Sequence, residues 1–139
     1  MSEIMNSRVP VGHKPDGTPY RVLVVDDSLF VVKQMAQILG SEGFEVAATA
    51  VDGEDAVSKY KELFPNIDLV TMDITLPKMD GLTALEHIIK FDPKARVVMA
   101  AAIGSQEAVK KALIAGAKNY IVKPLDHRKI MERIASTLR

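Results

Sequence analysis

Short apolar runs alternate five times along the sequence with longer segments in which apolar residues recur every three or four positions. Runs of three to six residues rich in Val and Ile predict buried strands, and the longer spacing predicts amphipathic helices. The predicted strand and helix pairs are 22–25 with 30–39, 46–50 with 56–64, 67–72 with 82–91, 97–101 with 109–115, and 120–122 with 130–138. This order of five βα units predicts the α/β fold class.

The predicted strands are apolar almost throughout, instead of alternating between apolar and polar residues. That pattern is typical of a parallel sheet covered by helices on both faces. Right-handed crossovers between parallel strands then give a doubly wound sheet. With 139 residues the chain has room for one such domain, which we place at residues 21–139.

Residues 1–20 show no core-forming period, and they contain three prolines and the turn dipeptide Asp16-Gly17. We expect this segment to be a flexible N-terminal arm. The alternative is that it folds back along the edge of the sheet or against a neighbouring chain.

Residues suited to helix termini flank the predicted helices. Ser, Thr, Asp and Asn side chains accept hydrogen bonds from first-turn N–H groups, and glycine ends a helix without steric cost. The N-terminal candidates are Ser28, Asp52, Ser105 and Asp126, and the C-terminal candidates are Gly40, Gly43 and Gly116.

Charge and composition exclude several classes of protein. Eighteen Lys and Arg balance eighteen Asp and Glu, so the sequence lacks the basic excess that draws proteins to nucleic acid. The chain has no Cys, and its longest apolar run, 97–103, is far shorter than the roughly 20 residues of a membrane-spanning helix. The first residues lack the layout of a secretory signal. We therefore expect a cytoplasmic protein with no nucleic-acid partner and no membrane insertion.

Charged residues follow three of the predicted strands, at the point where each strand ends. Asp26 and Asp27 follow the first strand, Asp73 ends the third, and Lys123 comes just after the fifth. Because parallel strands place ligand sites at their carboxyl ends, we expect these side chains to converge. Taken singly, each residue also has a plain structural explanation as a cap, a turn residue or a solvated charge.

Clustered carboxylates need a counter-charge, since a like pair at ~4 Å repels by ~4 kcal/mol at an effective dielectric constant of about 20. Carboxylate oxygens favour Mg²⁺. Softer metals are disfavoured because His13, His87 and His127 are scattered outside this edge, and we expect them at the surface. Mg²⁺, a lysine and a carboxylate are the parts needed for phosphoryl transfer to that carboxylate. Asp73, the single acid at the centre of the site, is the candidate acceptor.

Three groups of residues, taken together, are characteristic of one family. They are residues 24–28 (Val-Val-Asp-Asp-Ser), Met72-Asp73 followed by Pro77, Asp80 and Gly81, and Gly116-Ala117 leading to 120–124 (Tyr-Ile-Val-Lys-Pro). With these motifs, residues 21–139 resemble a response-regulator receiver domain, close to the stand-alone chemotaxis (CheY-like) type. The resemblance implies a flavodoxin-like fold with five parallel strands in the order 2-1-3-4-5 and helices on both faces.

The resemblance also implies a function and the roles of individual residues. Asp73 would accept a phosphoryl group from a histidine kinase. Asp26, Asp27, Asp73 and the backbone carbonyl of Thr75 would surround Mg²⁺. Lys123, which precedes a proline in a bond that is cis in many relatives, would contact the phosphoryl group. The protein would be a phosphoacceptor that assists its own phosphorylation and slow dephosphorylation, and not an enzyme in the usual sense.

One position departs from the family's pattern. The family places Ser or Thr at the end of the fourth strand, where its hydroxyl binds the phosphoryl group and draws an aromatic side chain inward. Ala101 stands there, and Tyr120 is the aromatic residue. We expect phosphorylation of Asp73 to persist with weaker coupling to Tyr120. Thr75 and Ile103 occupy positions that tune hydrolysis in the family, and because Ile103 cannot orient water, we expect slow dephosphorylation.

We expect any output to pass through the surface of the domain, since no DNA-binding or enzymatic segment follows the last predicted helix. That implies a downstream protein partner. The resemblance suggests a flagellar motor switch or a phosphorelay protein, with the former favoured. The candidate contact residues are Gln106, Glu107, Lys110, Lys111, Arg128, Lys129 and Arg133.

Two other interpretations stay open. Ala101 is compatible with a degenerate receiver that acts as a binding or dimerisation module. A metal-dependent hydrolase of the haloacid dehalogenase type also uses an aspartyl phosphate on an α/β sheet. It requires Asp-x-Asp after the first strand, which Asp26-Asp27-Ser28 does not provide.

Overall fold

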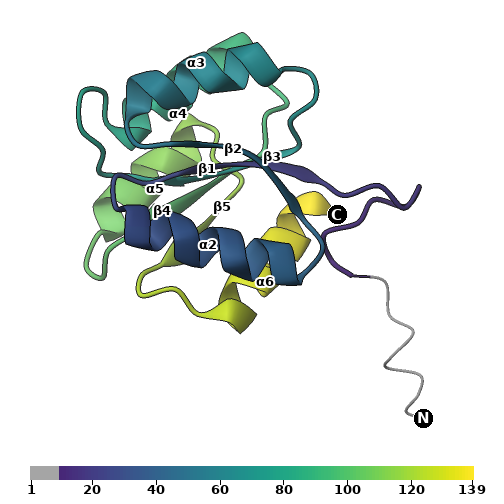
Figure 1. Cartoon of the computed structure of the whole chain (residues 1–139). Coiled ribbons are helices and arrows are strands. Elements are labelled where there is room, and N and C mark those ends of the chain that lie inside the picture. Colours follow the sequence, from purple (N-terminus) through teal and green to yellow (C-terminus); the bar gives the residue numbers. More distant parts are fainter. Residues whose placement is uncertain (1–9) are drawn as a thin grey trace.

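The computed structural model describes residues 10–139, which form one five-stranded parallel sheet and five helices (Figure 1). The strands are β1 (Arg21–Val25), β2 (Glu45–Ala50), β3 (Leu69–Asp73), β4 (Val97–Ala101) and β5 (Asn119–Val122). The helices are α2 (Leu29–Ser41), α3 (Gly53–Leu63), α4 (Gly81–Phe91), α5 (Gln106–Ala115) and α6 (His127–Leu138). The strand order β2-β1-β3-β4-β5 and the parallel pairing confirm the predicted doubly wound, flavodoxin-like fold.

The sheet lies between two layers of helices, with α3, α4 and α5 on one face and α2 and α6 on the other (Figure 1). Side chains of β1 alternate between the faces: Leu23 and Val25 enter the first core, and Val22 and Val24 enter the second. All four are at most 2% exposed. Burial on both faces explains why the strand is continuously apolar. Within residues 10–139, none of the helices is long and apolar enough to cross a membrane.

Hydrogen bonds at the helix N-termini confirm three of the predicted caps. Ser28, Asp52 and Asp126 each accept a hydrogen bond from the backbone N–H three residues on, at 3.3, 2.7 and 3.1 Å. Ser105 precedes α5 as predicted, but its side chain makes no capping bond within the described chain. Asp80, a cap not predicted from the sequence, accepts the N–H three residues on at 2.9 Å and begins α4.

The prediction that Gly40 ends a helix is wrong. Gly40 lies inside α2, which continues to Ser41, and the next glycine, Gly43, takes a left-handed φ of 90° beyond the helix end. Gly116 ends α5 as predicted, with a φ of 119°. The chain leaves α2 at Gly43 instead, where the Gly43 N–H donates to the Gly40 carbonyl and the Phe44 N–H donates to the Leu39 carbonyl, both at 3.1 Å.

The third strand begins at Leu69 and not at residue 67 as predicted. Asp68 interrupts the ladder, because its carboxylate accepts the Arg21 N–H at 2.8 Å, a bond that a regular strand gives to a backbone carbonyl. Ile67 is nevertheless buried in the core, which explains its apolar character.

Residues 10–20 pack against the end of the sheet where β1 and β2 begin. The Gly12 N–H donates to the Glu42 carbonyl at 2.8 Å, and the Tyr20 N–H donates to the Gly12 carbonyl at 2.7 Å. A Cβ on Gly12 would lie 2.3 Å from the Phe44 backbone nitrogen, so this close approach requires glycine. This placement favours the alternative in which the arm folds back along the sheet. Its first nine residues lie outside the described residues, and the division into arm and domain stays a prediction.

Candidate functional site

Asp26 and Asp73 lie side by side at the carboxyl ends of neighbouring strands. β1 and β3 pair with Val25 opposite Met72, so the next residue along each is an aspartate. The strand order reverses between β1 and β3, and α/β folds form their ligand sites at such a reversal. Asp26 is 3% exposed and Asp73 is 9% exposed. The fold therefore brings two carboxylates together largely out of water.

Lys123 supplies a positive charge to both carboxylates. Its Nζ donates to Asp26 Oδ2 at 2.8 Å and to Asp73 Oδ2 at 2.9 Å. The Lys123 N–H donates to the carbonyl of Ala101, the last residue of β4, at 2.8 Å, which fixes the lysine backbone. The bond from Lys123 to Pro124 is cis, as the resemblance implies. The predicted convergence of Asp26, Asp73 and Lys123 is confirmed.

The pKa of Lys123 reflects two opposing influences. Burial of the ammonium is the largest single influence and acts to lower the pKa. Hydrogen bonds to Asp26 and Asp73, together with the charges of these carboxylates, outweigh burial and raise the pKa of Lys123 above its ordinary value. Lys123 therefore stays a cation in the folded protein at neutral pH.

Asp27 completes a set of three carboxylates. Oxygen atoms of Asp26, Asp27 and Asp73 all lie within 4.8 Å of one another, and Asp27 is the exposed member. Three carboxylates and one ammonium leave two negative charges, which favours a divalent cation. An octahedral Mg²⁺ with oxygens at ~2.1 Å keeps its ligands about 3–4 Å apart, so small shifts would seat these carboxylates around the ion. The donor set fits a hard cation.

Thr75 lies next to this cluster, on the loop that follows β3. Its N–H donates to Asp73 Oδ1 at 3.1 Å, and the Ser28 N–H donates to Asp26 Oδ1 at 2.9 Å. With the two bonds from Lys123, each oxygen of Asp26 and Asp73 accepts a hydrogen bond, which fixes the orientation of both carboxylates. Contact of the Thr75 carbonyl with a cation stays a prediction.

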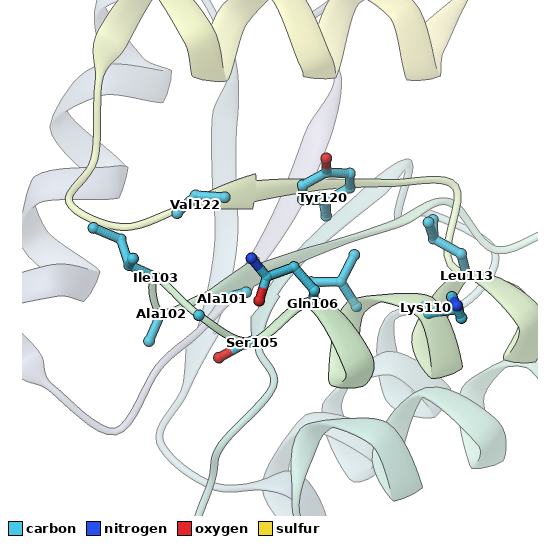
Figure 2. A pocket seen from close by; sticks show the side chains of 11 residues that line it. Ala101, Ala102, Ile103, Ser105, Gln106, Lys110, Leu113, Tyr120 and Val122 are labelled. Carbon is cyan, nitrogen blue, oxygen red and sulfur yellow. The ribbon is translucent and has the colours of Figure 1, made fainter.

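A pocket of about 470 Å³ lies between β5 and the start of α5 (Figure 2). Ala101, Ile103 and Tyr120 are among its lining residues, so the two positions predicted to affect switching share this cavity with Ile103, one of the two predicted to tune hydrolysis. Ala101 is 2% exposed, whereas Ile103 is 79% exposed. In Figure 2 the Tyr120 hydroxyl points away from Lys110 of α5 and toward the yellow helix, α6. The roles of these residues in switching stay predictions.

Arg133 and Asn119 hold the Tyr120 ring in this position. The guanidinium carbon of Arg133, on α6, lies 4.5 Å from the centroid of the Tyr120 ring. Arg133 Nη1 donates to Asn119 Oδ1 at 3.1 Å, and Asn119 Nδ2 donates to the Arg133 carbonyl at 3.2 Å. The sequence predicts Arg133 as an exposed candidate for partner contact but not its contact with Tyr120, because no spacing relates a tyrosine on a strand to an arginine on the following helix.

The polar residues predicted as partner contacts are all exposed. They are Gln106, Glu107, Lys110 and Lys111 on α5, and Arg128, Lys129 and Arg133 on α6. His87 and His127 are exposed as predicted, but His13 is half-buried because it packs beside Gly43. Leu29 and Phe30, which follow the site on α2, are 65% and 76% exposed, an apolar feature not predicted from the sequence.

Sequence comparisons identify relatives over nearly the whole chain. Residues 22–135 match the response regulator receiver domain. The chain is 67% identical over 135 residues to the chemotaxis protein CheY of Treponema pallidum, covering 97% of this chain and 94% of that protein. It is 50% identical over 119 residues to the CheY of Bacillus subtilis, covering 86% of this chain and 98% of that protein.

A solved structure has the same fold. A chain of the CheX–CheY–BeF₃–Mg complex from Borrelia burgdorferi is 54% identical to this protein, with a TM-score of 0.92. The similarity covers 95% of this chain and 99% of that chain. The strand order and the carboxylate cluster beside Lys123 agree with these matches. The chain belongs to the response regulator receiver domain family of two-component signalling, as a CheY-type member.

Proposed function

We propose that the protein is a phosphorylation-dependent signalling switch in which Asp73 accepts a phosphoryl group from a histidine kinase. One arrangement carries the proposal: three carboxylates lie within 4.8 Å of one another, and the Lys123 ammonium lies 2.9 Å from Asp73. Asp26 and Asp27 are adjacent in sequence and suit the cation. Asp73, from the neighbouring strand, is then the acceptor.

The proposed reaction forms an acyl phosphate on Asp73. A carboxylate oxygen of Asp73 attacks the phosphorus of a phosphohistidine, and the bond from phosphorus to the imidazole nitrogen breaks. The imidazole leaves with that electron pair and takes up a proton from solvent. Lys123 offsets the charge of the phosphoryl oxygens in the transition state. Mg²⁺ held by Asp26 and Asp27 would supply further neutralisation of the same oxygens.

The relatives support a place in chemotaxis signalling. The proteins of T. pallidum and B. subtilis that match this chain over most of their lengths are both chemotaxis proteins CheY. The complex from B. burgdorferi contains CheX, BeF₃ and Mg, which supports a protein partner and a Mg²⁺ requirement for this chain. The proposed output is contact of the α5, β5 and α6 surface with a downstream protein, with the flagellar motor switch as the favoured target.

Acetyl phosphate, a small phosphodonor, tests the proposal without the kinase. The purified protein is incubated with acetyl phosphate and Mg²⁺, and its intact mass is measured. We expect the mass of one phosphate on the wild type, none on Asp73→Asn, and none on the wild type when EDTA removes Mg²⁺. The control Asp55→Asn, which changes a carboxylate on α3, should be phosphorylated like the wild type.

Two outcomes would contradict the proposal. Phosphate retained by Asp73→Asn would place the acceptor elsewhere. A wild type that gains no mass would favour the degenerate receiver that Ala101 suggests. The comparisons do not support that alternative.

A further inference from the structure

The loop that follows Asp73 packs against the beginning of α3. Residues 74–80 connect β3 to α4 and include Thr75, whose N–H bonds to Asp73. Near its other end, the carbonyl of Met79 lies against Gly53, the first residue of α3. The path of this loop therefore connects the start of α3 to the carboxylate cluster.

Gly53 is buried, and the Met79 carbonyl occupies the space where a side chain would stand. A Cβ built on Gly53 would lie 1.9 Å from the Met79 carbonyl oxygen and 2.6 Å from its carbonyl carbon. Both atoms belong to the backbone, so no rotation of a side chain can relieve the clash. Only glycine at position 53 allows the loop to take this path.

The turn just before Met79 is strained. Lys78 has a φ of 66°, and the Met79 N–H donates to the Pro77 carbonyl at 2.7 Å, which closes a γ-turn. A side-chain-bearing residue in such a turn persists only where its surroundings hold it. The Lys78 Nζ lies 3.8 Å from Oδ2 of Asp52, the N-cap of α3. Asp52 thus lies beside the same turn, but an ion pair with an exposed lysine at this distance adds little, and the close packing of Gly53 is the contact that holds the turn.

The two ends of the loop, at Ile74 and Gly81, are also held together. The Gly81 N–H donates to the Ile74 carbonyl at 2.7 Å. A Cβ on Gly81 would lie 2.0 Å from the Asp73 carbonyl oxygen, so this contact also requires glycine. With both ends fixed, a displacement of Met79 has to be absorbed by the few residues between them, including Thr75.

We propose that Gly53 is a positioning residue for the cation site, because its missing side chain seats residues 74–80 so that Thr75 faces the carboxylate cluster. The inference rests on the proposed function, which places Mg²⁺ at Asp26, Asp27 and Asp73. Gly53 acts only through the Met79 carbonyl and the loop.

Magnesium binding by Gly53→Ala, measured by isothermal titration calorimetry, tests the inference. Alanine favours a helix more than glycine does, so any loss comes from displacement of the Met79 carbonyl. We expect the Kd for Mg²⁺ to rise about 10–100-fold, the usual effect of changing residues that orient metal ligands. The Thr75 amide resonance should shift in Mg²⁺-free protein, since its bond to Asp73 changes.

Gly40→Ala is the matched control. Gly40 lies inside α2, and within the described part of the chain a Cβ there has open space around it. This variant should keep the wild-type Kd for Mg²⁺ and the wild-type Thr75 resonance.

A second pair of variants tests the same loop from its exposed side. Proline cannot take the φ of Lys78, whereas glycine can, and the Lys78 side chain is 66% exposed, so the core is unchanged. We expect Lys78→Pro to weaken Mg²⁺ binding and Lys78→Gly to stay close to the wild type.

The outcomes separate this inference from the proposed function. Unchanged Mg²⁺ affinity in folded Gly53→Ala overturns the inference alone. Where Gly53→Ala does not fold, unchanged affinity in Lys78→Pro overturns it. A wild type that takes up no Mg²⁺ overturns the proposed function as well.

Discussion

Lys123 balances two carboxylates that the fold has taken out of water. The side chains of Asp26 and Asp73 are 4% and 12% exposed, and both bond to the Lys123 ammonium. Removing one partner of a buried ion pair is costly, because the other charge is left uncompensated. The lysine therefore contributes to the stability of the fold as well as to the proposed chemistry.

Lys123→Met should be less stable than the wild type in Mg²⁺-free buffer by about 1–3 kcal/mol, because Asp26 and Asp73 lose their cation. Mg²⁺ should stabilise the variant more than the wild type, since a more negative cluster binds the ion more tightly. Urea unfolding with and without Mg²⁺ measures both effects, with Lys110→Met on the exposed face of α5 as control. A variant as stable as the wild type would contradict this role of Lys123.

The methyl group of Ala101 cannot donate a hydrogen bond to a phosphoryl oxygen. A ligand shifts a conformational equilibrium only through unequal contacts with the two states, so Ala101→Ser should strengthen the coupling between phosphorylation and the Tyr120 ring. Phosphoryl transfer should also quicken, by up to ~10²-fold if the hydroxyl acts as an oxyanion-hole donor. NMR of the Tyr120 ring, with and without phosphorylation, measures the coupling. Ala102→Ser, at the exposed neighbouring position, is the control. A Tyr120 response no larger than that of the wild type would discredit the idea.

At the scale of single elements, α6 begins four residues after Lys123 and depends on its cap, Asp126. The Asp126 carboxylate accepts the Lys129 N–H at 3.1 Å. This backbone hydrogen bond is the main cause that lowers the pKa of Asp126 below its ordinary value. Folding thus favours the charged form of the Asp126 carboxylate. The resulting stabilisation is complete above the pKa of the unfolded chain and is lost as the pH falls through the lower folded value.

Asp126→Asn should be less stable than the wild type near neutral pH, since asparagine keeps the cap but loses the negative charge at the helix N-terminus. The difference should shrink as the pH falls below the ordinary pKa of aspartate, because the unfolded wild-type chain takes up a proton first and the folded carboxylate follows at its lower pKa. Urea midpoints of both proteins across this pH range provide the measurement. A difference that stays constant into the acid range would speak against the charged cap.

The strands and helices could be predicted because the spacing of apolar residues differs between them. The continuous apolar run 97–101, for example, precedes the helical spacing of 109–115. Gly40 marks the limit of such reasoning, because local pattern does not distinguish Gly40, which lies inside α2, from Gly43, where the chain takes a left-handed φ beyond the helix end. The bond between Gly12 and Glu42 was beyond prediction too, since no local period encodes a contact between distant segments.

The charged part of the site could be predicted because parallel topology brings the strand ends together. Knowing where their strands end is enough to place Asp26, Asp73 and Lys123 near one another. The contact of Gly53 with Met79 could not be predicted, because it depends on the backbone path of a loop. Residue types specify that a turn occurs, but not which backbone atom it brings to a helix.

At the scale of the whole molecule, two hydrophobic cores hold the edge of the sheet that carries the site. α3, α4 and α5 close one face, and α2 and α6 close the other (Figure 1). The sheet fixes Asp26 and Asp73, while the loop 74–80 and the segment leading into α6 bring Thr75 and Lys123 to them. A cation bound at this edge would therefore join parts of the chain that only the complete fold brings together.

A crystal structure of the protein grown with Mn²⁺ tests the central claim most directly. Mn²⁺ takes the oxygen ligands that suit Mg²⁺, and its anomalous scattering marks its position. We predict one strong anomalous peak among the carboxylates of Asp26, Asp27 and Asp73, with the Thr75 carbonyl turned toward it. Crystals in which Mn²⁺ is bound elsewhere, while Lys123 alone bridges Asp26 and Asp73, would contradict the claim.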